Sequence, residues 1–152
     1  MNILGIDPGM NTGLVLYSVG FGGGKIIRKK TIRAKGQDDE EKFEYLIKEF
    51  KNFLRNNKVD KVIIEKPRRY IRIVNYKPIN TKSAFKVVEA YRVIKTILSE
   101  WGIPTVIVHS PSRYKGLPTK HPAKALLRSL GYDVENMTEH EIDATVLALF
   151  YT

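Results

Sequence analysis

The sequence predicts a mixed α/β fold, in which a five-stranded sheet is flanked by helices. Its first part, within residues 2–34, holds three strand-like segments joined by short turns, which is typical of an antiparallel meander. Amphipathic helices then alternate with short apolar strands, and such alternation indicates strands that pair in parallel through crossover helices. The chain has 152 residues, which is enough for a core of ordinary size, so we expect one domain over 1–152.

The expected strands are short apolar runs bounded by turn-forming residues. They cover residues 2–7, 13–20, 25–34, 62–64 and 103–110. Tight turns are expected at 11–13, shortly after the first strand, and at 21–24, between the second and third strands. Two strand ends carry an acidic residue, because Asp7 closes the first strand and Glu65 directly follows the fourth.

The expected helices have apolar residues at helical spacing. They cover residues 38–57, 83–102 and 123–132, and a last helix begins near Thr138. Thr138 and Glu141 fit a capping box, and most of the residues after them are apolar, so we expect the last helix to be buried. Two basic segments, 66–82 and 111–122, are expected to be loops.

The charge indicates a polyanionic partner. Lys and Arg total 26 against 16 Asp and Glu, which gives a net charge of +10. Nucleic acid is the favoured partner of so basic a domain, and general solubility is the alternative explanation. The chain has no cysteine, which excludes disulfides and thiolate chemistry. The sequence has neither a membrane-spanning apolar run nor the features of a signal peptide, so we expect a cytoplasmic protein without a membrane partner.

Three acidic residues predict a catalytic site: Asp7, Glu65 and Asp143, the last of which lies within the apolar final helix. A buried carboxylate is costly unless a cation or a donor compensates for it. If the first and fourth strands are neighbours, these acids meet at a sheet edge where ligands gather. Clustered carboxylates suit Mg²⁺ or Mn²⁺, which indicates metal-dependent hydrolysis of nucleic acid. Alternatively, Asp7 belongs only to a turn, Glu65 is a solvated strand end, and Asp143 pairs with a core lysine.

His140 precedes Asp143 by three residues and therefore lies on the same face of the predicted helix. We expect it either to position or activate water, because imidazole titrates near neutral pH, or to ligate the metal. Imidazole is a less usual ligand of Mg²⁺ than carboxylate, which ranks the first role above the second. Glu139 is the alternative fourth group if the helix is rotated, and a plain surface histidine is the remaining interpretation.

Three segments, GIDPGMNTG, VIIEKP and HEIDATVLAL, resemble in order and spacing the acidic motifs of RuvC-type Holliday junction resolvases, which belong to the RNase H-like superfamily. The resemblance implies an RNase H-like nuclease that resolves four-way junctions by paired nicking through phosphodiester hydrolysis. It assigns Asp7, Glu65 and Asp143 to metal binding, and it places His140 where the family commonly has another acid. It also implies a catalytic basic residue before the penultimate helix, best matched by Lys120.

The resemblance further implies a branched DNA partner and a homodimer whose two-fold symmetry matches that of a four-way junction. Tyr70 is the candidate for an aromatic side chain that inserts near the junction centre, and an ordinary loop aromatic is its alternative. The apolar stripe of helix 83–101 either supplies part of the dimer interface or packs in the core, and the sequence fits both interpretations equally well. The basic residues expected to contact DNA are Arg68, Arg69, Arg72, Lys77, Lys82, Lys115, Lys120 and Lys124.

Three other functions compete with junction cleavage. An RNA-processing nuclease of the same superfamily is one, although DPGMNTG lacks the arginine expected in the pre-ribosomal-RNA relatives. A phosphate-binding ATPase of the actin and sugar-kinase type is the second, since its first loop also carries Asp-x-Gly and a later Thr-Gly, but it needs two such domains. A junction-binding protein without catalysis is the third. The sequence identifies no branch-migration partner.

Overall fold

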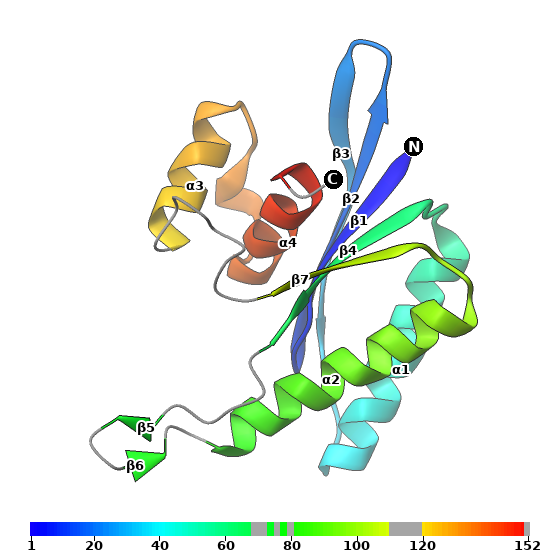
Figure 1. Ribbon diagram of the computed structural model, residues 1–152, viewed down its shortest axis with the longest axis vertical. Helices are drawn as coiled ribbons and strands as arrows, with labels where there is room; N and C mark the ends of the chain where they lie inside the picture. The colour runs from blue at the N-terminus through cyan, green and yellow to red at the C-terminus, as the bar shows by residue number, and fades with distance from the viewer. Residues whose placement is uncertain (68–72, 75–76, 79–80, 110–119, 151–152) are drawn as a thin grey trace.

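The computed structural model describes residues 1–67, 73–74, 77–78, 81–109 and 120–150, and it describes side chains within 1–67, 85–109 and 123–150. A five-stranded sheet with strand order β3-β2-β1-β4-β7 lies at the centre (Figure 1). Its strands are β1 (Asn2–Asp7), β2 (Asn11–Gly20), β3 (Gly23–Arg33), β4 (Lys61–Lys66) and β7 (Thr105–His109). The first three pair antiparallel, whereas β4 pairs in parallel with both β1 and β7, which confirms the predicted mixed sheet.

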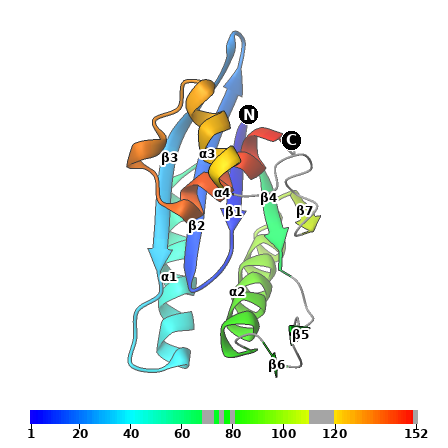
Figure 2. The ribbon, with the colours of Figure 1, turned by 90° about the vertical axis from the view of Figure 1, so that its left-hand side faces the viewer.

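Helices cover both faces of this sheet (Figures 1 and 2). They are α1 (Asp39–Asn56), α2 (Thr81–Glu100), α3 (Lys120–Ser129) and α4 (Glu139–Phe150), with the short 3-10 helix η2 (Val134–Asn136) before the last. The pair α1 and α2 lies on one face, and α3 and α4 lie on the other. Helix α1 returns the chain to β4 beside β1, as the predicted crossover requires.

Alternating side chains along β1 divide the interior into two cores. Leu4 and Ile6 point toward α1 and α2, where they join the largest apolar cluster. Ile3 points the other way and packs with Leu147 and Ala148 of α4. A third cluster joins α3, η2 and α4 through Ala123, Leu127, Val134, Ile142 and Val146. Because α4 packs against both the sheet and α3, it is buried over most of its length, as predicted.

Local chemistry fixes the ends of several elements. Asp38 caps α1, since its side-chain oxygen accepts a hydrogen bond from the backbone N–H of Glu41 at 2.8 Å. Gly102 follows α2 with a φ of 67°, a left-handed conformation that favours glycine. The hairpin of β2 and β3 projects beyond the rest of the sheet in Figure 1, and Phe21 at its turn is fully exposed.

The structure corrects three of the predicted boundaries. Strand β2 begins at Asn11, so the turn predicted at 11–13 is wrong, and the turn lies within 8–10 instead. The segment 66–82 is not wholly a loop, because β5 (Ile73–Val74) and β6 (Lys77–Pro78) pair as a separate two-stranded sheet. Helix α3 begins earlier than predicted, with a proline in its first turn, where the missing N–H of proline costs no helical hydrogen bond.

The apolar stripe of α2 belongs largely to the core. Tyr91, Ile94 and Ile97 are buried in the cluster that α2 shares with α1 and the sheet. The core-packing interpretation of this stripe is therefore confirmed for these three residues, because packing inside the molecule already covers them. Phe85, on the same helix, is 59% exposed.

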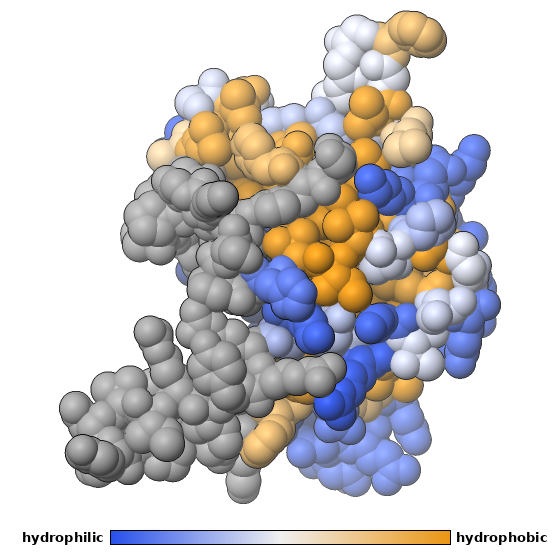
Figure 3. Space-filling model, viewed as in Figure 1, coloured by the Kyte–Doolittle hydropathy of each residue, from blue (hydrophilic) through white to orange (hydrophobic). Residues whose placement is uncertain are grey.

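The surface of the molecule is unevenly polar. Figure 3 shows hydrophilic residues over α1 and α2 at the lower right of the view, and a group of apolar residues near its centre. Among the exposed apolar residues is Val106 of the edge strand β7. Of the described helices, none combines the length and the apolar character that crossing a membrane requires.

Candidate active site

Asp7 and Glu65 leave two neighbouring parallel strands at the same end of the sheet. The last residues paired between β1 and β4 are Ile6 and Ile64, and the next residue along each strand is acidic. Because side chains alternate along a strand, both acids point to the face opposite that of Ile6 and Ile64, which is the face that α4 covers. The expectation that the first and fourth strands are neighbours is confirmed.

Two glycines let α4 lie directly on the sheet beside these strand ends. A Cβ atom at Gly5 would overlap the carbonyl oxygen of Ala144, and one at Gly13 would overlap the carbonyl oxygen of His140. Gly13 also pairs with Asp7 across β1 and β2. The missing side chains at the two glycines therefore bring the turn of α4 that carries His140 against the strand end that carries Asp7.

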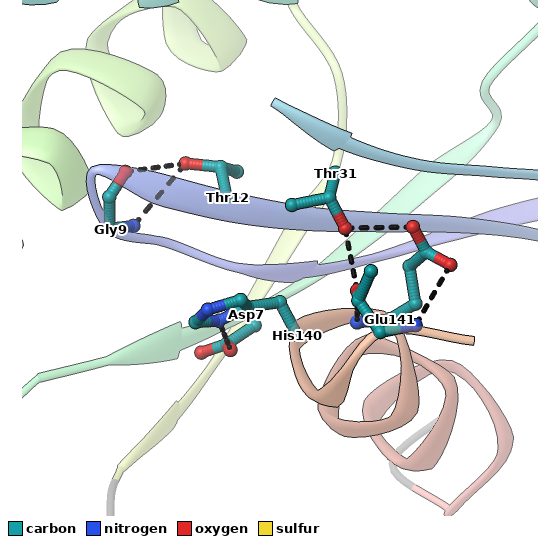
Figure 4. A network of polar contacts seen from close by, with 7 residues as sticks. Asp7, Gly9, Thr12, Thr31, His140 and Glu141 are labelled. Atoms are coloured by element: carbon teal, nitrogen blue, oxygen red, sulfur yellow. Dashed lines mark hydrogen bonds and ion pairs between the residues drawn. The ribbon is translucent and has the colours of Figure 1, made fainter. Parts of the chain in front are cut away.

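A polar network fastens the first turn of α4 to β3 (Figure 4). The hydroxyl of Thr31 donates to Oε2 of Glu141 at 2.7 Å, and it lies 2.6 Å from the hydroxyl of Thr138. Since the single hydroxyl hydrogen of Thr31 is used in the hydrogen bond to the carboxylate, Thr138 is the donor of the second contact. The predicted capping box is confirmed, with Glu141 N–H donating to Thr138 Oγ1 at 3.1 Å and Thr138 N–H donating to Glu141 Oε1 at 3.3 Å. Glu141 is thus a buried acid with a structural role.

A buried threonine holds the segment that follows Asp7. The hydroxyl of Thr12 donates to the carbonyl oxygen of Gly9 at 2.7 Å and accepts a hydrogen bond from the N–H of Gly9 at 3.3 Å (Figure 4). In the same turn, the carbonyl oxygen of Met10 accepts a hydrogen bond from the N–H of Ala34 at 2.8 Å. These contacts fix the backbone directly after Asp7.

The predicted acidic residues and His140 meet in one cavity of about 530 Å³. Asp7 of β1, Glu65 of β4, and His140 and Asp143 of α4 all line it. Glu65 and Asp143 are nearly buried, at 7% and 3% exposure, whereas the side chain of His140 is 34% exposed. The structure therefore brings together side chains that are far apart in the sequence, and it leaves the histidine open to solvent.

His140 contacts Asp7 directly. Its Nδ1 lies 3.2 Å from Oδ2 of Asp7, and Figure 4 shows the ring facing the carboxylate. Because a carboxylate accepts hydrogen bonds, we assign the donor of this contact to Nδ1 of His140. His140, rather than the exposed Glu139, occupies the fourth position beside the acids.

The donor set of the cavity suits a divalent ion that prefers oxygen ligands. Three carboxylates line the cavity, and Mg²⁺ and Mn²⁺ are typically bound by such groups. Within the part of the chain that the structure describes, no three acidic, histidine or cysteine side chains are already arranged to hold an ion. The residue types fit the predicted cofactor.

Most of the residues predicted to contact DNA lie outside the described side chains. Those outside the described residues are Arg68, Arg69, Tyr70, Arg72 and Lys115. Lys77 lies in β6, Lys82 in α2 and Lys120 at the start of α3. Their side chains lie outside the described ones. Lys124 is described, and its Nζ lies 3.5 Å from Oε2 of Glu135, which forms an ion pair between α3 and η2. The DNA-binding roles of all these residues stay predictions.

Solved resolvase structures have a similar fold. RuvC of T. thermophilus, solved in complex with a Holliday junction substrate, matches with a TM-score of 0.75 and 20% identity over 97% of this chain and 90% of that chain. The yeast mitochondrial Holliday junction resolvase Ydc2 matches with a TM-score of 0.62 and 14% identity, over 96% of this chain and 76% of that chain. Fowlpox virus resolvase, solved with its substrate Holliday junction DNA, matches with a TM-score of 0.60 and 13% identity, over 98% of this chain and 97% of that chain. No family model and no curated protein matches the sequence.

The chain has the RuvC fold. Its likeness to T. thermophilus RuvC covers nearly the whole of both chains. The resemblance predicted from the three acidic segments is therefore confirmed at the level of the fold. At 20% identity, the RuvC fold by itself does not establish an activity, which has to follow from the chemistry of the cavity.

Several features of this RuvC-fold site are not predicted by the sequence patterns. Lys42 of α1 and Lys86 of α2 line the cavity, although both belong to helices whose charges are typical of a solvated face. Gly5 and Gly13 allow the close approach of α4 to the sheet. In the sequence, only the presence of glycines within two apolar strands indicates such an approach. Glu141 is predicted only as a capping residue, yet it also binds Thr31 of β3.

Proposed function

We propose that this protein is a structure-selective DNA endonuclease that resolves four-way junctions by paired nicking, through metal-dependent hydrolysis of phosphodiester bonds. The observation that carries the proposal is the meeting of Asp7, Glu65 and Asp143 in one cavity, with His140 beside them. Clustered carboxylates repel one another, so stability alone does not favour this arrangement. The shared fold of two resolvases that were solved with Holliday junction DNA supports branched DNA as the substrate.

The proposed roles follow from the residue types. Asp7, Glu65 and Asp143 would hold Mg²⁺ or Mn²⁺ through carboxylate oxygens. Such an ion, when bound, supplies positive charge at the phosphodiester and lowers the pKa of water. The contact with Asp7 holds the ring of His140 by Nδ1, and we propose that Nε2 takes a proton from the attacking water. Because imidazole is a less usual ligand of Mg²⁺ than carboxylate, we rank this role above constant metal ligation.

The net charge of +10 supports a polyanionic substrate. We propose that Lys120 contacts a phosphate of the strand that is cut and that Tyr70 inserts near the junction centre. Paired nicking requires two active sites, so we propose a homodimer. The exposed Phe85 of α2 is the candidate interface residue, in place of the buried stripe. The residues proposed to contact the DNA backbone are Arg68, Arg69, Arg72, Lys77, Lys82, Lys115 and Lys124.

A nicking assay on a synthetic four-way junction tests this function. The assay compares the junction with a linear duplex of the same sequence and with a structured RNA, each with and without Mn²⁺. We expect paired nicks in the junction only when the ion is present, and we expect Asp7→Asn to abolish cutting while junction binding persists. Faster cleavage of the RNA would favour an RNA-processing nuclease. Junction binding without nicking under any divalent ion would identify a catalytically silent binding protein.

A further inference from the structure

The cavity is lined by basic as well as acidic side chains. Asp7, Glu65, His140 and Asp143 come from the sheet and α4, whereas Lys42 comes from α1 and Lys86 from α2. Both lysines belong to the pair of helices that covers the other face of the sheet. A strand that reaches the acids through this cavity therefore also comes near these two lysines.

Lys86 is held at the rim of the cavity by an exposed ion pair. Its Nζ lies 3.3 Å from Oδ1 of Asp39, in the first turn of α1, and the two side chains are 32% and 59% exposed. Ion pairs this exposed are weak, because water screens the charges. A phosphate can therefore take the place of the Asp39 carboxylate at little cost, and a lysine–phosphate contact is charge-assisted.

The net charge of the cavity lining also favours a role for a cationic side chain in binding the phosphate. Three carboxylates against two lysines leave the lining with a formal charge of −1, which disfavours entry of an anionic DNA strand. A divalent ion at the carboxylates reverses this sign, but it acts only on the phosphate beside it. A lysine of the cavity lining adds a further positive charge that attracts the same strand.

We propose that Lys86 binds a backbone phosphate of the DNA strand that lies in the cavity, and that Asp39 holds the lysine in place until the strand arrives. The inference rests on the proposed junction cleavage and adds a phosphate contact from α2 to those expected from the basic segments. Neutralisation of the nearby acids is the competing role of Lys86. Of the two roles, only phosphate binding predicts that replacement of Lys86 changes the salt dependence of DNA binding.

The first test compares Lys86→Ala with Lys30→Ala. Lys30 is a matched control, because it pairs with Glu49 at 2.9 Å and is 41% exposed, yet it lies on β3 outside the cavity. Junction binding is measured without divalent ions over a range of salt concentrations. Loss of one phosphate contact is expected to lower the slope of log K against log salt by about 1 in Lys86→Ala. The value of kcat/KM for nicking is expected to fall roughly ten- to a hundredfold, and Lys86→Arg is expected to recover most of it.

The second test leaves Lys86 in place. Asp39→Asn frees the ammonium group, so junction binding is expected to tighten more than in Glu49→Gln, which makes the same charge change at the control pair. This comparison applies even if Lys86→Ala proves unstable. If the wild-type protein cuts no junction, the proposed function fails. If the wild type cuts junctions but Lys86→Ala matches Lys30→Ala in salt slope and rate, or Asp39→Asn matches Glu49→Gln, the inference about Lys86 is wrong.

Discussion

Gly13 pairs with Asp7 across β1 and β2, and it also lies under the carbonyl oxygen of His140 at the start of α4. This one position joins the strand that carries the first acid to the helix that carries the histidine and the last acid. Because a Cβ atom there would overlap the helix backbone, the close approach of α4 to β2 depends on the absence of a side chain. The geometry of the cavity is therefore set by a residue with no chemistry of its own.

Gly13→Ala should displace the first turn of α4 and disrupt the site. We expect the free energy of unfolding to fall by about 1–3 kcal/mol, as for other overpacked positions, with a larger loss of nicking than of junction binding. Gly20→Ala is the control in the same strand, since a Cβ atom there meets nothing within 4 Å. Its stability should stay within about 0.5 kcal/mol of the wild type. Equal stability and activity in both variants would contradict the close packing.

Replacement of His140 tests its contact with Asp7. His140→Ala removes the group that is proposed to accept a proton, so we expect the nicking rate to fall by about a hundredfold or more. His140→Asp restores a carboxylate at this position and should retain part of the activity. Single-turnover nicking of a bound junction measures the chemical step in each variant. Equal rates in the wild type and both variants would exclude a role for His140.

The hydrogen bonds around Glu141 should matter for folding rather than for chemistry. Thr31→Val removes the donor to a buried carboxylate, which is expected to cost about 2 kcal/mol of unfolding free energy. Thr138→Ala removes the helix cap and is expected to cost about 1 kcal/mol. Denaturant unfolding measures both values. At a temperature where the variants are folded, their nicking rates should lie near that of the wild type, and a loss as large as that of an acid variant would place this network in the catalytic machinery.

Binding of a divalent ion should stabilise the folded protein. An ion that binds only the native state contributes about 1.4 kcal/mol at ten times its dissociation constant. For a chain of this size, such a contribution raises Tm by roughly 3–6 °C. A thermal melt with and without Mn²⁺ measures the effect, and the same melt of Asp143→Asn is the control. A rise of the same size in the variant would show that the ion binds outside the cavity.

Much of the fold follows from patterns within single segments. The apolar runs that end at Asp7 and Glu65 and the capping box at Thr138 each have a local cause, so their positions in the structure agree with those predicted. The acids could be singled out because burial of a carboxylate in an apolar segment is costly wherever the chain folds. The resemblance to resolvases supplied the order in which these segments meet.

Other features depend on contacts between segments far apart in the sequence. In the sequence, Lys86 is indistinguishable from an ordinary charged residue on a helix surface. Its position in the cavity becomes visible only when α1 and α2 are placed beside the strand ends. The early start of β2 depends on the hydrogen bonds between Thr12 and Gly9, which shorten the turn after Asp7. The α2 stripe was ambiguous for a similar reason, since an apolar helix face fits a core and an interface equally well until its neighbours are known.

The most direct test of the central claim compares acids inside the cavity with a buried acid outside it. Asp7, Glu65 and Asp143 line the cavity, whereas Glu141, on the same helix as Asp143, turns toward Thr31. Nicking of a four-way junction in Mn²⁺ is measured for Asp7→Asn, Glu65→Gln, Asp143→Asn and Glu141→Gln. We predict a loss of about a hundred- to a thousandfold in each of the first three, with junction binding retained, and near wild-type nicking in Glu141→Gln. Wild-type nicking by Asp7→Asn, or equal losses in Asp143→Asn and Glu141→Gln, would contradict the account.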